Sequence, residues 1–419
     1  MTRRALIVAG LAVATALFLA YVPAHRGFFD VGVYHGAVHY WLRDGGQLYD
    51  YLRPPTNYGF TYPPFAALVL SPLALLDWHP AIALSLVVNA SAGAALVYLL
   101  VDPVARRNGW PRGFAFAVAA CAVAVFEPVR DTFSFGQVNL VLLALVVADT
   151  RLLRTTRWYG VGIGVATAIK LTPGIFVLYL LVTGQRRAAA VATGTAAAAT
   201  FVALAVAPDA SRTFWTEALW DTDRIGNLAY VSNQSLQGVL ARLDPAAPSR
   251  LAWLLVVAAV LAVWGYRVRR VDPVTGAALT GVVGCLVSPI TWVHHLVWVL
   301  PALVLLFDRH RRRWAVTAYV LLCSSVVWLW WDGRAPGAFL GANAYVWICV
   351  ALLLALPARE VLQGQHVPVD AEAADHPGGH RGHHRVVPEL LPGVDVRDVH
   401  LDERGAQHGA GVAHRVRIM

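Results

Sequence analysis

Apolar runs recur along this chain from its first residues to residue 356, and they constrain the fold more than any other feature. Each run is about 15–22 residues long, which suits a helix that crosses a bilayer. Hydrophobic residues make up 58% of the sequence and charged residues only 14%, which is too little charge to cover a soluble domain. We therefore expect an all-α polytopic membrane protein.

The apolar runs predict about twelve transmembrane helices. The first run follows Arg3 and Arg4 and resembles a signal peptide, but the many later runs favour an uncleaved first helix. Residues 63–101 form either one long span or a broken one, and the topology closes only if they cross an odd number of times. The expected spans are residues 5–22, 63–101, 114–126, 137–149, 158–169, 173–183, 188–207, 249–265, 273–288, 294–307, 314–331 and 338–356.

Clusters of arginine between the runs predict the orientation, because positively charged loops stay in the cytoplasm. The alternate loops then face outward. Two of these, residues 23–62 and 208–248, hold most of the polar but non-basic sequence, so we expect any chemistry on the outward side. The cytoplasmic clusters are Arg106–Arg107, Arg151/Arg154/Arg157, Arg186–Arg187, Arg267/Arg269/Arg270 and Arg309/Arg311/Arg312/Arg313.

Residues 357–419 differ in character from the transmembrane domain predicted over residues 1–356. They contain eight of the fifteen histidines and show no apolar periodicity. We interpret them as a disordered cytoplasmic tail, with a metal-binding histidine tract as the alternative. The four cysteines all lie inside apolar runs, without metal-ligand spacing or an evident disulfide pair, and are expected to be core residues.

The segment FFDVGVYHGAVHYWL, residues 28–42, opens the first outward loop. Its apolar residues recur at helical spacing, which predicts an amphipathic helix lying in the membrane interface. Asp30 stands at the start of this helix. It is either an N-cap that accepts backbone N–H bonds or a carboxylate that takes a proton from a hydroxyl at the water–lipid boundary. The predicted apolar face comprises Val31, Tyr34, Val38, Trp41 and Leu42.

Polar side chains at membrane depth are costly and therefore indicate functional sites. Lys170 is the only lysine of the chain and stands between two apolar runs, beside Pro173. It either extends to the interface or holds a phosphate as a point charge. His294 and His295 follow Trp292 at a helix mouth, and this pair favours a site that donates to phosphate oxygens or moves a proton.

Other polar residues lie at the mouths of predicted spans or in the outward loops, and each admits two interpretations. Glu127 and Arg130 form an internal ion pair, or Arg130 binds a ligand. The remaining side chains cap helices, order loops or belong to an interfacial aromatic belt, or they contact a sugar. This last set comprises Tyr62, Gln137, Asn139, Asn233 and Gln234.

The sequence contains no motif for binding a nucleotide. No GxxxxGK segment followed by Ser or Thr occurs, no GxGxxG segment opens a βαβ unit, and no HExxH segment is present. An enzyme with this sequence must therefore take its donor from the membrane, because no site for a nucleotide sugar is visible. We also expect no nucleic-acid partner.

Five segments of this chain, taken together and in order, resemble a known family. They are FFDVGVY with YGFTYPPF, EPVRDTFSFGQVNL, GVGIGVATAIKLTPGIF, NQSLQGVLARL and SPITWVHHLVWVLPAL. In this order they resemble the actinobacterial GT-C glycosyltransferases of family 87, which are polyprenol-phosphate-mannose-dependent α-(1→2)-mannosyltransferases. The resemblance covers about residues 1–356. It implies a GT-C fold, a helical bundle whose first outward loop places amphipathic helices over the active site.

The resemblance also implies roles for individual residues. Asp30 matches the catalytic base, and Lys170, His294, His295 and Arg130 are the expected partners of the leaving phosphate. No metal or other cofactor is implied. The expected sugar-binding residues are Tyr62, Gln137, Asn139, Asn233 and Gln234.

The implied reaction is an inverting transfer of mannose from polyprenyl-phosphate mannose to the 2-hydroxyl of an α-mannoside. The expected acceptor is a mannosylated lipid, either a phosphatidylinositol mannoside or a lipoglycan, on the outer face of the plasma membrane. Two alternatives remain open at this point. One is a GT-C transferase of another lipid-linked sugar, and the other is a non-catalytic transporter of lipids or lipid-linked sugars.

Overall fold

The computed structural model describes residues 2–357, with gaps at 23–24, 222–225, 310 and 332–336. The chain divides into two compact units, Met1–Leu362 and Gln363–Met419. The second unit lies outside the described residues, as does the predicted tail of residues 357–419 apart from Pro357. Within the described part every regular element is helical, apart from one isolated bridge between Leu52 and Gly59. The all-α class is therefore confirmed.

Short α-helices outnumber long ones, and segments of 3-10 or π-helix extend several of them. The α-helices are α1 (Arg3–Tyr21), α2 (Phe29–Leu42), α3 (Pro64–Leu70), α4 (Trp78–Arg107), α5 (Arg112–Val125), α6 (Glu127–Phe135), α7 (Asn139–Ala148), α8 (Val161–Ile169), α9 (Ile175–Val182), α10 (Arg186–Val206), α11 (Pro208–Thr213), α12 (Leu236–Leu243), α13 (Arg250–Val268), α14 (Pro273–Val287), α15 (Leu300–Asp308), α16 (Arg312–Cys323), α17 (Ala338–Ala342) and α18 (Ala344–Ala355). The 3-10 and π segments are η1 (Ser71–Leu75), η2 (Asp149–Leu153), η3 (Thr172–Gly174), η4 (Phe214–Ala218), η6 (Val293–Val299) and η7 (Val326–Trp330).

Each predicted span overlaps a helix, but the count of about twelve transmembrane helices is not confirmed. Among the described residues, four helices are long and apolar enough to cross a membrane, namely α1, α4, α10 and α13. A fifth is added if α5 and α6, which are bent by 68° relative to each other, form one span. Several shorter apolar helices accompany them, so the helical unit fits a polytopic membrane protein.

One stretch settles an open alternative and another differs from its prediction. Residues 63–101 take the broken form: α3 ends at Leu70, η1 follows it to Leu75, and α4 begins only after Asp77, which has an extended backbone. Residues 127–136, expected as a connection between the predicted spans 114–126 and 137–149, instead contain helix α6. Pro128 lacks the N–H that a continuing α5 would need, so the chain turns and starts a new helix.

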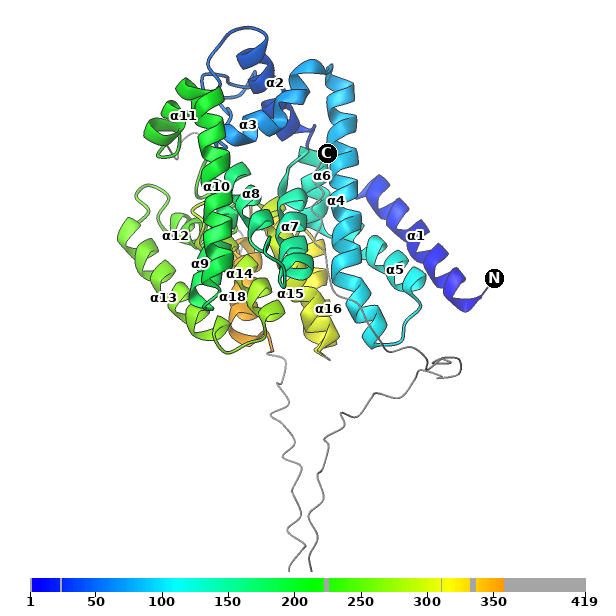
Figure 1. Ribbon diagram of the computed structural model, residues 1–419. Coiled ribbons are helices and arrows are strands. Elements are labelled where there is room, and N and C mark those ends of the chain that lie inside the picture. Colours follow the sequence, from blue (N-terminus) through cyan, green and yellow to red (C-terminus); the bar gives the residue numbers. More distant parts are fainter. Residues whose placement is uncertain (1, 23–24, 222–225, 310, 332–336, 358–419) are drawn as a thin grey trace, which may run out of the picture. The chain divides into compact units, whose positions relative to one another are not determined.

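The long helices α4 and α10 run in opposite directions, so that the start of α4 and the end of α10 lie on the same side of the helical unit (Figure 1). Figure 1 shows α2, α3 and α11 gathered where α4 begins and α10 ends, and α3 contacts α10 while α2 contacts α4. The clusters Arg106–Arg107 and Arg186–Arg187 lie at the opposite ends of these long helices. There, charge pairs join neighbouring helices: Arg107 with Asp308 at 2.5 Å, Arg309 with Asp272 at 2.7 Å, and Arg112 with Asp102 at 2.6 Å.

Helix α8, which leads to Lys170, packs against α10 through a glycine. Gly160 precedes α8 with a φ of 110°, a conformation that favours glycine. Its N–H donates to both Asp149 carboxylate oxygens at 3.0 Å, and Asp149 also accepts from Ile163 N–H at 3.0 Å. A Cβ on Gly160 would stand 2.3 Å from the Ala188 carbonyl oxygen of α10. The start of α8 is thus fixed by a buried cap and by close backbone contact.

Replacing Gly160 with alanine should lower the free energy of unfolding by about 2–4 kcal/mol, because the backbone is strained and the methyl group overlaps α10. Gly194→Ala is the matched control, since a Cβ at Gly194 has nothing within 4 Å. That change should be neutral or stabilise by about 0.5–1 kcal/mol. The measurement is the unfolding temperature of each purified variant in detergent. Equal unfolding temperatures for the two variants would contradict the close contact between α8 and α10.

Candidate active site

Asp30 lies in the first turn of α2 and is not its N-cap, so the capping interpretation is wrong. The N-cap is Phe28, whose left-handed backbone (φ 51°) starts the helix and whose N–H donates to the Ser134 carbonyl at 2.9 Å. Arg53 donates to the Phe29 carbonyl from the other side. The start of α2, and with it Asp30, is therefore held between α6 and Arg53.

One oxygen of the Asp30 carboxylate accepts no hydrogen bond from the described residues. Its Oδ2 is buried and has no hydrogen-bond partner among the described residues. Burial raises the pKa of Asp30 from 3.8 to about 6, against the opposing effects of a hydrogen bond with Gln137 and of the Lys170 and Arg53 charges. A carboxylate in such a position is suited to accept a proton from a bound hydroxyl.

The predicted apolar face of α2 is mostly buried. Val31, Tyr34 and Val38 are buried, and Trp41 packs partly against the core. Leu42 is 47% exposed and lies outside the buried face. The placement of α2 in a membrane interface stays a prediction.

Tyr62 is the centre of a hydrogen-bonded cluster beside Asp30. Its hydroxyl donates to Gln137 Oε1 at 2.8 Å and accepts from Tyr34 at 2.9 Å and from Lys170 Nζ at 3.2 Å. Lys170 Nζ also lies 4.9 Å from the centre of the Tyr62 ring. The cluster thus joins α2, the segment before α3, the α6–α7 turn and the end of α8.

Lys170 has two further partners. Its Nζ donates to Asn139 Oδ1 at 3.1 Å and lies 2.9 Å from His295 Nε2. His295 Nδ1 accepts from the Trp292 N–H at 3.0 Å, which fixes the ring in η6. Six predicted site residues therefore meet in one place: Asp30, Tyr62, Gln137, Asn139, Lys170 and His295.

His294 lies beside this cluster and presents a second unpartnered atom. Its ring is packed edge-on against Phe135 at 5.1 Å and against His295 at 4.6 Å between centroids. Its carbonyl accepts from Thr132 and Asn139, each at 3.3 Å. Its Nε2 is buried and has no hydrogen-bond partner in the described part of the chain. His294 is therefore held by its backbone while its ring nitrogen is available to a ligand.

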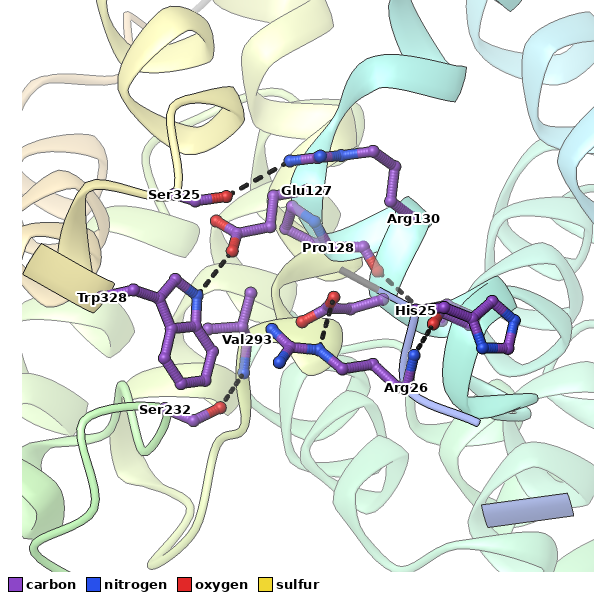
Figure 2. A network of polar contacts seen from close by, with 12 residues as sticks. His25, Arg26, Glu127, Pro128, Arg130, Ser232, Val293, Ser325 and Trp328 are labelled. Carbon is purple, nitrogen blue, oxygen red and sulfur yellow. Dashed lines mark hydrogen bonds and ion pairs between the residues drawn. The ribbon is translucent and has the colours of Figure 1, made fainter. Parts of the chain in front are cut away.

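Arg130, a predicted phosphate partner, belongs to a different polar network (Figure 2). Its Nη2 donates to Ser325 Oγ at 3.3 Å and to the Cys323 carbonyl at 3.2 Å. The predicted Glu127–Arg130 ion pair is not formed. Glu127 instead accepts from Trp328 Nε1 at 2.8 Å and from the Tyr345 hydroxyl. Both side chains therefore tie α6 to the C-terminal helices.

The side chains of Asn233 and Gln234 form hydrogen bonds with backbone atoms. Asn233 donates to the Leu228 and Pro289 carbonyls at 3.0 and 3.3 Å, and its Oδ1 accepts from the Thr291 N–H at 2.9 Å. Gln234 Nε2 donates to the Val231 and Ala342 carbonyls, each at 2.7 Å. The structure places both outside the Tyr62–Lys170 cluster, in agreement with the loop-ordering interpretation.

Two members of the site region were not singled out from the sequence. Tyr34 was assigned only to an apolar face, yet its hydroxyl binds Tyr62. Arg26 lies 3.5 Å from Asp131, and its guanidinium is 4.7 Å from the Trp328 ring (Figure 2). The signal for Arg26 was its position, because it is an arginine in a loop predicted to face outward, four residues before Asp30.

Chemically, the cluster pairs an acceptor with donors. Asp30 presents a carboxylate oxygen without a partner, while Lys170 and the two histidines present nitrogen atoms close by. Among the residues that the structure describes, no group of three or more His, Cys, Asp and Glu side chains could hold a metal ion. The arrangement suits a reaction in which a hydroxyl loses a proton and an anion departs.

Comparison with known proteins gives consistent matches. A family model described as Glycosyltransferase family 87 matches residues 60–289. A polyprenol-phosphate-mannose-dependent alpha-(1-2)-phosphatidylinositol mannoside mannosyltransferase of Mycolicibacterium smegmatis is 32% identical over 374 residues, covering 78% of this chain and 83% of the relative. Its Mycobacterium tuberculosis counterpart of the same description is 34% identical, with the same coverage.

A third relative carries a different acceptor in its name. It is a polyprenol-phosphate-mannose-dependent alpha-(1-2)-phosphatidylinositol pentamannoside mannosyltransferase of Mycobacterium tuberculosis, 34% identical over 326 residues, with 74% of each chain covered. No solved structure matches this chain.

Replacing Tyr345 with phenylalanine tests the structural role of Glu127. The change removes a hydroxyl that donates to a buried carboxylate, which should cost about 1–3 kcal/mol of unfolding free energy. Tyr266→Phe is the control, because Tyr266 is 61% exposed. The unfolding temperature in detergent should fall for Tyr345→Phe only. An unchanged value would show that Glu127 does not depend on this contact.

Proposed function

Because this chain belongs to glycosyltransferase family 87, we propose that it transfers mannose from polyprenyl-phosphate mannose to the 2-hydroxyl of a mannosylated lipid. The chain is a glycosyltransferase, and the names of its relatives support both the donor and a phosphatidylinositol mannoside as acceptor. A lipoglycan acceptor has the same chemistry. The observation that carries the catalytic part of the proposal is the unpartnered Oδ2 of Asp30 beside the Lys170 cluster.

Asp30 acts as the general base in this proposal. Its carboxylate takes the proton of the acceptor 2-hydroxyl while that oxygen attacks the anomeric carbon of the donor mannose. The bond between the anomeric carbon and the phosphate oxygen breaks, and polyprenyl phosphate leaves with the bonding electrons. A single displacement of this kind converts a β-linked donor into an α-linked product, so the reaction inverts the configuration.

The leaving phosphate gains negative charge as the sugar departs. Lys170, His294 and His295 are the proposed donors to it, because their nitrogen atoms lie in or beside the cluster that contains Tyr62 and Asn139. Hydrogen-bond donors directed at the leaving oxygen stabilise this developing charge. Arg130 donates from Nη2 to Ser325 and the Cys323 carbonyl, while its buried Nε has no partner among the described residues.

Three residues of the cluster are proposed to position the sugars. Tyr62, Gln137 and Asn139 present an aromatic face, an amide and a second amide within reach of both Asp30 and Lys170. Asn233 and Gln234 are proposed to shape the site indirectly, by ordering the segment before Trp292.

We also propose that the reaction takes place on the outer face of the plasma membrane. Asp30 and Tyr62 lie in the first predicted outward loop, near the ends of α4 and α10 that are opposite the arginine clusters. Since arginine-rich loops stay in the cytoplasm, this end would face outward. Residues 1–356 would form the GT-C domain, and residues 357–419 a cytoplasmic tail.

Asp30→Asn should reduce mannose transfer by about 10²–10⁴-fold, because the amide cannot accept the proton. The assay uses membranes, radiolabelled polyprenyl-phosphate mannose and a phosphatidylinositol mannoside. Asp50→Asn is the matched control, since Asp50 lies in the same loop and is exposed. It should retain the wild-type rate.

Unchanged transfer by Asp30→Asn would remove Asp30 as the base. If wild type transferred no mannose with any acceptor but moved lipid-linked sugar across vesicles, the transporter alternative would replace the enzyme. Transfer of another lipid-linked sugar in place of mannose would correct the donor.

The pH dependence of kcat/KM should show an acid limb. Asp30 must be ionised to act as base, and its pKa is raised to about 6, so the rate should fall by about tenfold per pH unit below that value. Above it, the Asp30 contribution should be constant. An acid limb centred near the ordinary value of 3.8, with Asp30 still essential, would contradict the raised pKa.

A further inference from the structure

The hydrogen bonds of His295 fix which of its nitrogen atoms carries the proton. The Trp292 backbone N–H can only donate, and it points at His295 Nδ1 from 3.0 Å. Nδ1 must therefore carry a lone pair. A neutral imidazole has one protonated nitrogen, so Nε2 carries the hydrogen. This Nε2–H faces Lys170 Nζ at 2.9 Å.

The other two contacts of Lys170 are ones in which it donates. Asn139 Oδ1 is an amide oxygen, which can only accept. The Tyr62 hydroxyl uses its hydrogen on Gln137 Oε1, so it also accepts from Lys170. Lys170 Nζ thus donates twice and must accept once, from His295. A neutral amine has two hydrogens and one lone pair, whereas an ammonium has three hydrogens and no acceptor.

These hydrogen bonds form a continuous series in which every group donates to the next. The donors run from Trp292 N–H through His295, Lys170 and Tyr62 to Gln137, whose amide then bonds to Asp30. This series of hydrogen bonds starts at the Trp292 backbone N–H, which can only donate, and ends at the Asp30 carboxylate, which accepts. Reversing any one bond would leave two donors or two acceptors facing each other. The neutral form of Lys170 is therefore required by the arrangement as a whole.

We infer that Lys170 is a neutral amine in the unliganded protein and takes up a proton when the donor phosphate binds. His295 is the positioning residue, since its Nε2–H occupies the lone pair of Lys170 until phosphate enters. The inference rests on the proposed function. It goes beyond it because it assigns a proton-coupled step to donor binding, before any sugar is transferred.

Several titratable groups face Lys170 and define the charge that it meets. Asp30 comes from α2, Tyr62 from the segment before α3, Cys285 from α14, and His294 and His295 from η6. Among these groups Asp30 is the one carboxylic acid, and its carboxylate already forms a hydrogen bond with Gln137. A phosphodiester brings one further negative charge, which favours an ammonium beside it. When Lys170 turns to the phosphate, the His295 Nε2–H is released and can donate to the same group.

Calorimetric titration measures the proton directly. Purified full-length protein in detergent is titrated with geranyl-phosphate mannose, a short donor, in buffers of different ionisation enthalpy. The titration is run at about pH 9, which lies above the lowered pKa of Lys170 and at which Asp30 is ionised. The slope of binding enthalpy against buffer enthalpy should show uptake of about one proton per donor bound. The donor dissociation constant of wild type should also rise by about tenfold per pH unit in this range.

Two variants identify the group that takes up the proton. Lys170→Arg should bind with uptake near zero, because a guanidinium stays charged. His295→Gln should also lose uptake, since the amide oxygen accepts from an ammonium and lets Lys170 keep its proton in the unliganded state. Loss of a merely structural contact would weaken binding without changing the number of protons.

Each outcome separates this inference from the proposed function. Donor binding by wild type without proton uptake, and without a pH-dependent dissociation constant, overturns the neutral Lys170 but leaves the mannosyltransferase intact. Equal uptake by wild type and both variants also overturns it, because another group would then be titrating. If wild type neither binds the donor nor transfers mannose, the proposed function fails and the inference fails with it.

Discussion

The structure of this site depends on one constraint, which is that polar groups surrounded by apolar helices must satisfy one another. Water is scarce there, and an unpaired donor or acceptor is costly. The cluster around Tyr62 and Lys170 meets this constraint with bonds from five separate segments. In and beside this cluster, Asp30 Oδ2 and His294 Nε2 are buried without a partner among the residues that the structure describes. The atoms left free beside a satisfied cluster are the ones that a substrate can use.

Broken helices make this arrangement possible. A continuous helix uses its own backbone donors and acceptors, and it carries its side chains along a fixed spiral. Here α5 ends before α6, α6 ends at Gly136 (φ 71°), and α8 ends at Lys170, which has an extended backbone. The segment that leads to His295 is a 3-10 turn rather than an α-helix. Each break directs a polar side chain inward that a regular span would place elsewhere.

Much of the fold and part of the site could be predicted from the sequence. Apolar length located the helices, since burial in lipid selects for it directly. Asp30, Lys170 and His295 stood out because polar residues are rare beside apolar runs, and the structure brings them together with Tyr62, Gln137 and Asn139. Their roles remain proposals.

The sequence did not reveal which polar residues form hydrogen bonds with one another. Arg130, Asn233 and Gln234 carry the same local signal as the cluster residues, but their partners are backbone and side-chain atoms far away in the chain. Helix α6 was equally hidden, because hydropathy does not distinguish a bent helix from a loop between spans. For residues 63–101, hydropathy left a single span and a broken one both open.

The cluster has a practical consequence that follows from composition. Its central nitrogen belongs to the only lysine among 419 residues. Feeding cells with lysine labelled at its side-chain nitrogen would therefore give a single side-chain resonance, with no assignment needed. The protein thus contains a natural spectroscopic reporter inside its own site, placed where the donor headgroup is proposed to bind and visible without any substitution.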